Sequence, residues 1–505
     1  MPELVVTVTG GAVRGVMRRG LRMWRGIPYA TATRFRAPIA PEPWTGIRDG
    51  HEFGPVAPQD RKGQFLGPKP HIPIAEDALS INVIAPEIAD KPLPVMVFIH
   101  GGAYSVGSSR EIPSMGEGLV RRGDVIFVNF NYRLGALGYL DFSRYATREN
   151  PIDRNLGLRD QLAALEWIRD NIAAFGGDPG NVTLFGESAG ANAVTTLMTV
   201  PRAAGLFARA IAQSSPPNAI YPPELTSIWA EEFLELLSEV VDDSSTESTS
   251  VEDAADLLMT ASIDELVTAT TRLQLRSPDA WPGTIALCPV IDGDLLPERP
   301  LDAFKAGRAH PLPLIIGTND REGSLFTGRL DILATTPPRI RAIFARTKKK
   351  ARKAVKAQYP GLPAKRPAAD FGGDYAFWFP TIKVAERHSA FAQVYFYRFD
   401  IAPRLVRLAG YDATHGLELF ALFDRMDGRF GRAMGLLGGR RAFKRAGERM
   451  QDRWLAFARG DRPGDDWPAY SRRRRSTLII DEADRVELDP RRERRKAWQE
   501  FVPHV

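Results

Sequence analysis

The sequence predicts an α/β fold in which helices flank a central, mostly parallel β-sheet. Three strongly apolar runs, over residues 94–99, 125–130 and 182–185, have the length and composition of strands. Strands that are apolar on both faces belong inside a parallel sheet that is covered by helices. Between the last two runs, residues 160–168 have helical periodicity, and this helix is expected to end near the glycines of 175–177. Together these observations indicate a β-α-β unit.

Further strands are expected on both sides of this unit. Near the N-terminus, apolar runs at 4–8, 21–24 and 79–84 alternate with turns that contain Gly and Pro, a pattern typical of strands. Towards the C-terminus, the runs 312–317 and 393–397 are expected to return to the sheet.

Helices inserted into the sheet topology are expected at residues 224–275. Within this insertion, residues 241–253 form an acidic, serine-rich stretch, which we interpret as an exposed loop. Such a loop need not divide domains. Residues 1–505 are therefore expected to form one domain with a helical insertion.

The composition is that of a soluble globular enzyme. Of the 505 residues, 44% are hydrophobic and 25% are charged, unlike a disordered chain. No window approaches the ~18 consecutive apolar residues of a membrane span, and the N-terminus lacks the basic and apolar regions of a secretion signal. The single Cys288 cannot form an intramolecular disulfide, and its apolar neighbours indicate a buried thiol. We therefore expect a cytoplasmic protein with no membrane span.

The net charge of +6 and the pI of 9.3 raise the alternative of a nucleic-acid binder. The basic runs 348–350 and 472–475 lie far apart, and 61 acidic residues nearly balance 67 basic ones. No helix-turn-helix, zinc-finger or RNA-binding signature accompanies these runs. We interpret them as solvated surfaces and expect no nucleic-acid partner.

The motif that points most directly to chemistry is Gly186-Glu187-Ser188-Ala189-Gly190. An apolar strand precedes it, and residues 189–194 can open a helix. A sharp strand-to-helix turn that presents a nucleophilic serine strains the backbone and needs small neighbours, which Gly186 and Gly190 provide. A glycine-rich turn without chemistry is the alternative, but the strand and the helix favour Ser188 as a nucleophile.

A nucleophilic serine also needs backbone donors for the oxyanion that develops on the substrate carbonyl. The loop His100-Gly101-Gly102-Ala103 follows the strand at 94–99, and its small residues let N–H groups face a ligand. A further donor is the N–H of Ala189, directly after the nucleophile. A plain glycine turn explains the composition of this loop but not its coincidence with Ser188.

A catalytic triad further requires a histidine that accepts the serine proton. In the α/β-hydrolase fold, which such a serine turn indicates, the acid follows the nucleophile and the histidine follows the acid. Of the seven histidines, this order leaves His310, His388, His415 and His504.

The acid is expected in the segment 317–324, because this segment follows an apolar strand and so lies at a strand end. Two carboxylates lie there, Asp320 and Glu322. Either could orient an imidazole, so the residues alone leave both open.

Nearly the whole chain resembles the type-B carboxylesterases, the family that contains bacterial para-nitrobenzyl esterases and the cholinesterases. The resemblance is carried by Ser188 and its loop together with Phe35-Arg36-Ala37-Pro38 and the stretches 76–83, 131–135, 155–161 and 175–179. It implies an α/β-hydrolase fold with inserted helical segments over an active-site gorge.

The resemblance also selects the remaining triad residues. Ala413-Thr414-His415-Gly416-Leu417-Glu418-Leu419 is similar to the family's catalytic-histidine segment, which implies His415 as the base. Glu322, rather than Asp320, matches the family's catalytic glutamate.

By the same resemblance, the oxyanion donors fall on Gly102 and Ala103, with Gly101 shaping the turn. Ser214 matches a serine that supports the triad. The chain departs from the family pattern at Ala103 and at Ser215, where many relatives have glycine.

Ala57 and Ala78 stand where many secreted relatives have a disulfide pair, in agreement with a reducing compartment. Both cysteines of the pair are therefore missing together.

These residues predict a serine carboxylesterase that forms an acyl-enzyme and needs neither metal nor organic cofactor. Short-chain or aryl esters are the expected small-molecule substrates, and the oligomeric state is left open. The alternative is a catalytically inactive scaffold or adhesion protein on the same fold, which the complete triad disfavours. Aromatic residues that could line the substrate pocket, or simply pack in the core, are Tyr104, Trp281, Phe326, Phe377, Trp378 and Phe379.

Overall fold

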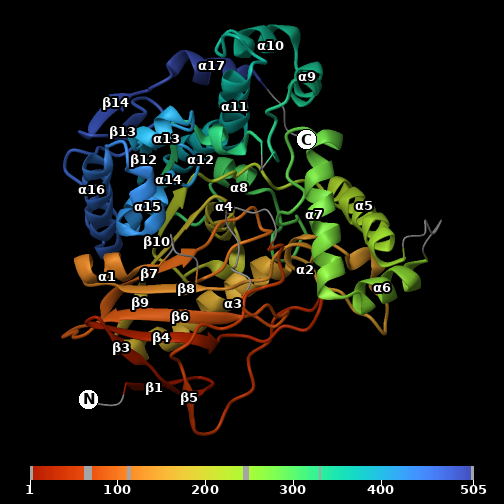
Figure 1. Ribbon diagram of the computed structural model, residues 1–505, viewed down its shortest axis with the longest axis vertical. Coiled ribbons are helices and arrows are strands. Elements are labelled where there is room, and N and C mark those ends of the chain that lie inside the picture. Colours follow the sequence, from red (N-terminus) through yellow and green to blue (C-terminus); the bar gives the residue numbers. More distant parts are fainter. Residues whose placement is uncertain (1–3, 62–70, 111–114, 243–249, 329–330, 502–505) are drawn as a thin grey trace.

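A computed structural model describes residues 4–61, 71–110, 115–242, 250–328 and 331–501 of the chain. Its centre is an 11-stranded mixed sheet (Figure 1). Across this sheet the strands are β14 (Arg485–Leu488), β13 (Ser476–Ile480), β12 (Val394–Phe399), β11 (Leu314–Asn319), β10 (Arg209–Gln213), β9 (Gly177–Glu187), β7 (Leu93–Ile99), β8 (Ile126–Phe130), β6 (Ser80–Pro86), β4 (Leu21–Pro28) and β3 (Val16–Arg18).

The middle of the sheet is parallel and its edges are antiparallel. All neighbouring strands from β13 across to β8 run parallel. The strand β14 on one side, and β6, β4 and β3 on the other, pair antiparallel. A separate small sheet holds β1 (Val5–Val8), β2 (Gly11–Arg14) and β5 (Ile47–Asp49). The expected α/β class with a mostly parallel sheet is therefore confirmed.

Helices cover both faces of the sheet (Figure 1). One face carries α3 (Leu156–Asn171), α4 (Ala189–Leu197) and α12 (Phe379–His388), and the other carries α1 (Glu117–Gly123), α14 (Leu417–Leu422) and α16 (Arg440–Arg459). The remaining helices are α2 (Ala136–Tyr139), α5 (Pro223–Asp242), α6 (Val251–Thr260), α7 (Ile263–Ala280), α8 (Pro300–Ala306), α9 (Pro337–Ala345), α10 (Lys349–Lys356), α11 (Lys365–Gly373), α13 (Arg404–Leu408), α15 (Arg429–Met434) and α17 (Arg492–Glu500).

Strand β7 shows why its residues are apolar on both faces. Val95 and Val97 pack into the core cluster on the side of α3 and α4, whereas Met96 and Phe98 pack into the cluster on the side of α16. Successive side chains of a strand point to opposite faces, so a strand between two helical layers buries all of them. The first of these clusters reaches from Val8 to Phe501 and thus joins the two ends of the described chain.

The strand expected at 312–317 is displaced in the structure, because β11 runs from Leu314 to Asn319. Pro313 has no N–H and cannot donate to a β-ladder, so the pairing with β12 starts at Leu314. Strand β12 similarly extends to Phe399, beyond the expected 393–397.

The helical insertion expected at 224–275 is present as α5, α6 and α7, and it ends later than expected, at Ala280. The prediction of a loop over 241–253 is wrong at both ends. Residues 241 and 242 belong to α5, and residues 251–253 form the first turn of α6. Ser250 and Asp253 form a capping box there, so serine and acidic residues mark a helix start and not a loop. Residues 243–249 lie outside the described residues.

Two smaller expectations concern membrane spans and the lone cysteine. No helix within the described ranges is both long and apolar enough to cross a bilayer. Cys288 is buried, as expected, and burial raises the pKa of its thiol.

Candidate active site

Ser188 lies between the end of β9 and the start of α4, near the middle of the sheet. Its backbone has φ 57° and ψ −124°, a conformation that non-glycine residues rarely adopt. Two hydrogen bonds hold it there: its N–H donates to the Gln213 carbonyl at 2.9 Å, and its carbonyl accepts from the Asn192 N–H at 2.9 Å. Local strain is thus stored at the residue that the motif singles out.

The glycines of the motif are required by close backbone contacts. A Cβ at Gly186 would lie 2.6 Å from the carbonyl of Gly190, and a Cβ at Gly190 would lie 2.1 Å from the carbonyl oxygen of Ile99. Both distances are shorter than van der Waals contact. Only residues without a side chain therefore let β9 turn so sharply into α4 beside β7.

The loop after β7 lies against this turn. A Cβ at Gly101 would lie 2.7 Å from the Glu187 carbonyl oxygen and 3.0 Å from Ser188 Cβ. Gly102 has φ 115° and Ala103 has φ 52°, so the loop bends through left-handed conformations. Within the described part of the chain, the N–H groups of Gly102, Ala103 and Ala189 donate to no protein acceptor. These three donors are free to bind a ligand oxygen.

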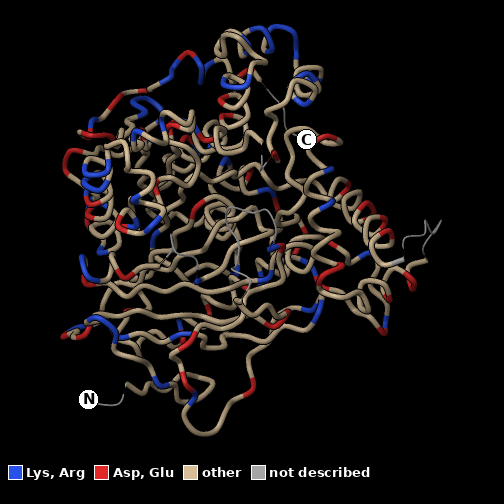
Figure 2. Tube along the Cα trace, in the orientation of Figure 1, with Lys and Arg blue, Asp and Glu red and all other residues tan. Residues whose placement is uncertain are grey.

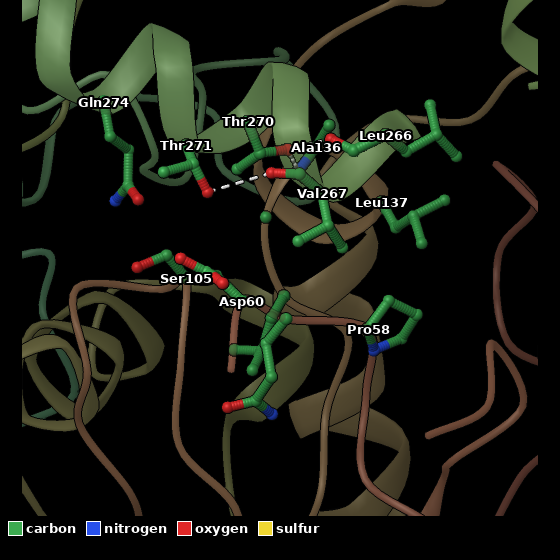
Figure 3. Close-up of a pocket in the computed structure, with 13 residues that line it drawn as sticks. Pro58, Asp60, Ser105, Ala136, Leu137, Leu266, Val267, Thr270, Thr271 and Gln274 are labelled. Atoms are coloured by element: carbon green, nitrogen blue, oxygen red, sulfur yellow. Dashed lines mark hydrogen bonds between the residues drawn. The ribbon is translucent and has the colours of Figure 1, made fainter. Parts of the chain in front are cut away.

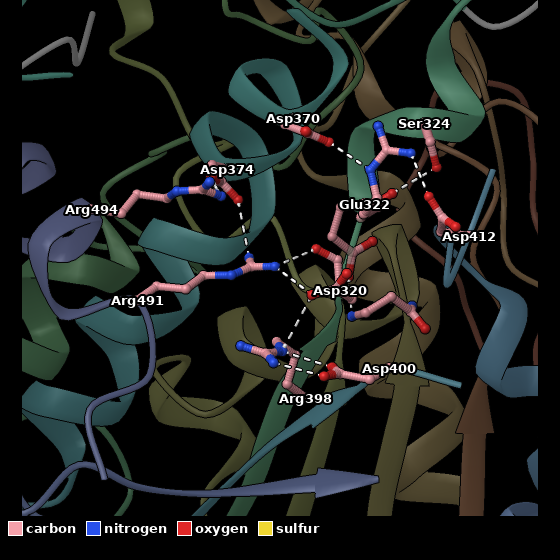
Figure 4. Close-up of polar contacts among 12 residues, drawn as sticks. Asp320, Glu322, Ser324, Asp370, Asp374, Arg398, Asp400, Asp412, Arg491 and Arg494 are labelled. Carbon is pink, nitrogen blue, oxygen red and sulfur yellow. Dashed lines mark hydrogen bonds and ion pairs between the residues drawn. The ribbon is translucent and has the colours of Figure 1, made fainter. Parts of the chain in front are cut away.

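The His415 imidazole binds Glu322 and not Asp320. His415 Nδ1 lies 2.5 Å from Glu322 Oε2, and both side chains are buried. Asp320, in contrast, is turned towards Arg491 and Arg398 (Figure 4). The geometry thus separates the two carboxylates that the residues alone left open.

Ser214 supports the carboxylate of Glu322. Its hydroxyl donates to Glu322 Oε1 at 2.6 Å, and the backbone N–H of Asn319 donates to the same oxygen at 2.6 Å. The second oxygen of Glu322 remains for the imidazole. Ser214 itself is fully buried and has φ 54°, so the strand end at β10 is also strained.

Two further buried carboxylates, Glu187 and Glu418, lie beside the histidine, and the sequence reasoning did not identify them. His415 Nε2 lies 3.2 Å from Glu187 Oε1 and makes no hydrogen bond with any described residue. Glu418 accepts hydrogen bonds from Ser214 and Asn319. Two features of the sequence could have pointed to them: Glu187 lies within the serine motif, and Glu418 lies three residues after His415.

Burial and mutual repulsion set the protonation of this group. Burial raises the pKa of Glu187 to about 7, with Glu322 adding to the effect, and raises the pKa of Glu418 to about 8. Burial lowers the pKa of His415, but the carboxylates of Glu187 and Glu322 outweigh it and raise the pKa to about 9. The imidazolium form of His415 is therefore well stabilised.

Arg321 ties the loop of Glu322 to the loop of His415. Its guanidinium donates to Asp370 and Asp412, each at 2.8 Å, and its N–H donates to the Ala413 carbonyl at 3.0 Å. Its side chain is only 7% exposed. The relative position of acid and histidine thus depends on a buried arginine that the sequence reasoning did not identify.

The aromatic residues proposed for a substrate pocket separate into two groups. Phe326 and Phe377 lie beside the imidazole, with ring centroids 5.1 and 4.4 Å from that of His415. The others lie elsewhere: Tyr104 stacks on Tyr139 and donates to Asn192, Trp281 is the C-cap of α7, Trp378 lies under Arg491, and Phe379 stacks on Trp498.

A pocket lies under the helical insertion, where α7 faces the segments 58–60 and 134–137 (Figure 3). Thr270 and Gln274 of α7 line it, and so does Ser105, two residues after the end of the donor loop. The Ala136 N–H donates to the Thr270 hydroxyl at 3.3 Å. The insertion is therefore fixed beside the donor loop. No group of three or more metal-ligating side chains occurs among the residues that the structure describes.

Comparisons with known proteins agree with this geometry. The model of the carboxylesterase family matches residues 2–498. The para-nitrobenzyl esterase of Bacillus subtilis (strain 168) is 35% identical, over 98% of both chains, and the phenmedipham hydrolase of Pseudarthrobacter oxydans is 29% identical, over 96% of this chain and 97% of the other. A solved PNB esterase structure superposes with a TM-score of 0.85 at 33% identity, covering 99% of this chain and all of the other. The chain therefore belongs to the carboxylesterase family and is a carboxylic ester hydrolase of the α/β-hydrolase fold.

Proposed function

We propose that Ser188 is the nucleophile of this carboxylesterase, His415 its general base and Glu322 the acid that orients the base. The observation that carries the proposal is the 2.5 Å contact between Glu322 Oε2 and His415 Nδ1. This contact supports a proton on Nδ1 of the neutral ring, which leaves Nε2 to accept the serine proton. That side faces Glu187, the residue directly before Ser188.

The reaction proceeds in two halves. His415 Nε2 accepts the hydroxyl proton while Ser188 Oγ bonds to the ester carbonyl carbon. The tetrahedral intermediate then collapses, and the alcohol leaves with the proton from His415. Water next attacks the acyl-enzyme with His415 again as base, and the carboxylic acid is released as Ser188 regains its proton.

Gly102, Ala103 and Ala189 form the oxyanion hole in this proposal. Their free N–H groups support it, because preorganised donors stabilise the charge that develops on the carbonyl oxygen. Gly101 shapes the turn by permitting its close approach to Ser188, and Ser214 supports Glu322 through its hydroxyl. In this proposal Glu322 holds the imidazole, and the three N–H groups bind the oxyanion.

Short-chain or aryl esters are the proposed substrates. Phe326 and Phe377 flank the imidazole and give an apolar wall where an aryl or short alkyl group contacts it. One relative is named for para-nitrobenzyl esters, which are aryl-bearing esters. A panel of esters varied separately in acyl and alcohol length tests this preference, and selectivity for long acyl chains would contradict it.

The assignment is tested by hydrolysis of para-nitrophenyl acetate and butyrate. Wild type is expected to turn over both, and Ser188→Ala is expected to lose at least about 10³-fold in kcat/KM. The matched control is Ser215→Ala, which makes the same change at another buried serine and is expected to keep its activity. Equal activity in wild type and Ser188→Ala, or none in either, would overturn the assignment.

We further propose a cytoplasmic location and a single domain. The location is supported by the one buried cysteine and by Ala57 and Ala78 in place of a disulfide pair. Fractionation of the cells that make the protein checks the location: recovery with a periplasmic or secreted marker would contradict it.

A further inference from the structure

A cleft lined by arginines lies between α13 and the start of α16, outside the active site. It has a volume of about 560 Å³. The Arg404 N–H donates to the Gly438 carbonyl at 3.2 Å and so ties α13 to the loop before α16. The charged side chains that line the cleft are Arg404, Arg407, Arg440, Arg441, Arg445 and Glu482.

Most of these arginines form no ion pair with the described residues, and Glu482 is the one acidic residue among the five arginines of the lining. Arg440 pairs with Asp427. Arg404, Arg407, Arg441 and Arg445 are exposed and form no ion pair with any residue in the described ranges. The first turn of α16 also lacks an acidic residue, so the positive end of its dipole adds to the same field. Figure 2 shows Lys and Arg segments on α16 and its neighbours, with Asp and Glu segments among them.

Exposed leucines adjoin the arginines. Leu408 follows Arg407, and Leu436 and Leu437 directly precede the glycines of the cleft. Their exposed fractions are 74%, 75% and 52%. Single exposed leucines are ordinary, but three of them beside a basic cleft combine the two features that a bilayer surface recognises.

We propose that this basic face, defined as α13 and residues 436–445, docks the protein on an anionic phospholipid bilayer. Guanidinium groups bind the headgroup phosphates, for which their fork of donors is suited. The leucines enter the boundary between headgroups and acyl chains, where burial of apolar surface adds to the electrostatic attraction. A soluble polyanion satisfies the arginines alone and leaves the leucines in water.

The test is sedimentation with vesicles at physiological salt. The wild-type chain is expected to bind vesicles of phosphatidylglycerol and phosphatidylcholine, and not vesicles of phosphatidylcholine alone. The triple variant Arg404→Gln/Arg407→Gln/Arg441→Gln is expected to bind roughly 100-fold more weakly, because each basic residue near an anionic surface contributes about 1 kcal/mol, or about a factor of five. Leu436→Ser/Leu437→Ser is expected to weaken binding roughly tenfold.

A matched control removes the same charge elsewhere. Arg472→Gln/Arg473→Gln/Arg474→Gln changes an exposed basic run that does not line the cleft, and it is expected to change binding by less than about threefold. All variants are expected to hydrolyse para-nitrophenyl acetate at the wild-type rate, which shows that they are folded.

Three outcomes overturn the proposal. These are no sedimentation of wild type with the anionic vesicles, equal loss in the control and cleft variants, and binding that inositol hexakisphosphate abolishes while the leucine variant binds normally. The last outcome assigns the cleft to a soluble polyanion. Because every readout is vesicle binding, failure here leaves the esterase proposal intact.

Discussion

The His415 ring lies between two buried carboxylates, Glu322 at Nδ1 and Glu187 at Nε2. In the proposed mechanism the first orients the base, whereas the second lies beside Nε2, the nitrogen that accepts the Ser188 proton. Both stabilise the imidazolium form, which explains why the pKa of His415 is raised to about 9 in spite of burial. A base must be neutral to accept the serine proton, so with His415 as the proposed base this balance is expected to set the pH above which activity rises.

Replacing Glu187 by Gln is expected to lower the pKa of His415, because a negative charge beside Nε2 is removed. Activity rises with pH as His415 loses its proton, so the rising limb of kcat/KM moves to lower pH, by about one unit. The measurement is a pH profile with an uncharged ester. A limb that stays in place or moves to higher pH would show that Glu187 does not control the base.

At the residue scale, the sequence predicts what is local and misses what is distant. Ser188 could be proposed as the nucleophile from five consecutive residues and the strand before them. Glu322 and Asp320 could be separated only by resemblance, because both follow β11, and what distinguishes them is a contact between Glu322 and a histidine 93 positions away. The contacts of Glu187 and Arg321 also join residues that are far apart in the sequence, and hydrophobic periodicity does not reveal such contacts.

Among the elements, the turn after β11 and the loop before α14 carry the proposed acid and the proposed base. These two segments meet through an isolated β-bridge between Arg321 and Thr414. Ser324 reinforces the bridge by a 2.7 Å hydrogen bond between its hydroxyl and that of Thr414. The buried Arg321 side chain then binds carboxylates on both sides.

Arg321→Met is expected to destabilise the fold and slow the reaction. Removing the buried guanidinium takes this partner from Asp370 and leaves Asp412 paired with Arg366 alone, and it costs about 3 kcal/mol. The loops of Glu322 and His415 are also released, so kcat falls more than KM rises. Urea unfolding and steady-state kinetics measure the two effects.

Arg366→Gln is the control for this prediction. It pairs with the same Asp412, but its side chain is 65% exposed, so only a small change is expected. Equal losses in the two variants would contradict the assigned role of Arg321.

For helices and strands too, the sequence predicts some features and misses others. The periodic helices and apolar strands of the core were predictable, because burial on one or both faces leaves a pattern. The start of β11 depends on the missing N–H of Pro313, and the start of α6 depends on the capping box of Ser250. Both are single-residue effects that average hydrophobicity does not show.

In the molecule as a whole, the insertion α5–α7 shares its core with the sheet. Phe233 of α5 and Leu266 of α7 belong to the same apolar cluster as Val95 of β7 and Leu184 of β9. A core shared in this way supports the proposal of one domain, because neither part can lose its packing alone.

One cooperative unfolding transition is therefore expected. Hydrogen exchange measured by mass spectrometry in rising urea should show peptides of α5–α7 and of β9 losing protection at the same urea concentration. If the peptides of the insertion exchange at clearly lower urea, the insertion is a separate unit and the single-domain proposal is wrong.

The central claim is that Ser188 becomes covalently acylated with His415 as its base. The most direct test is reaction with a para-nitrophenyl alkylphosphonate, in which Ser188 Oγ bonds to phosphorus and para-nitrophenolate leaves. Peptide mass spectrometry is expected to find one phosphonyl group per chain, on Ser188, formed in parallel with the loss of esterase activity. His415→Asn is expected to react far more slowly, and Ser188→Ala not at all. A label on another residue, or inactivation without a label on Ser188, would contradict the account.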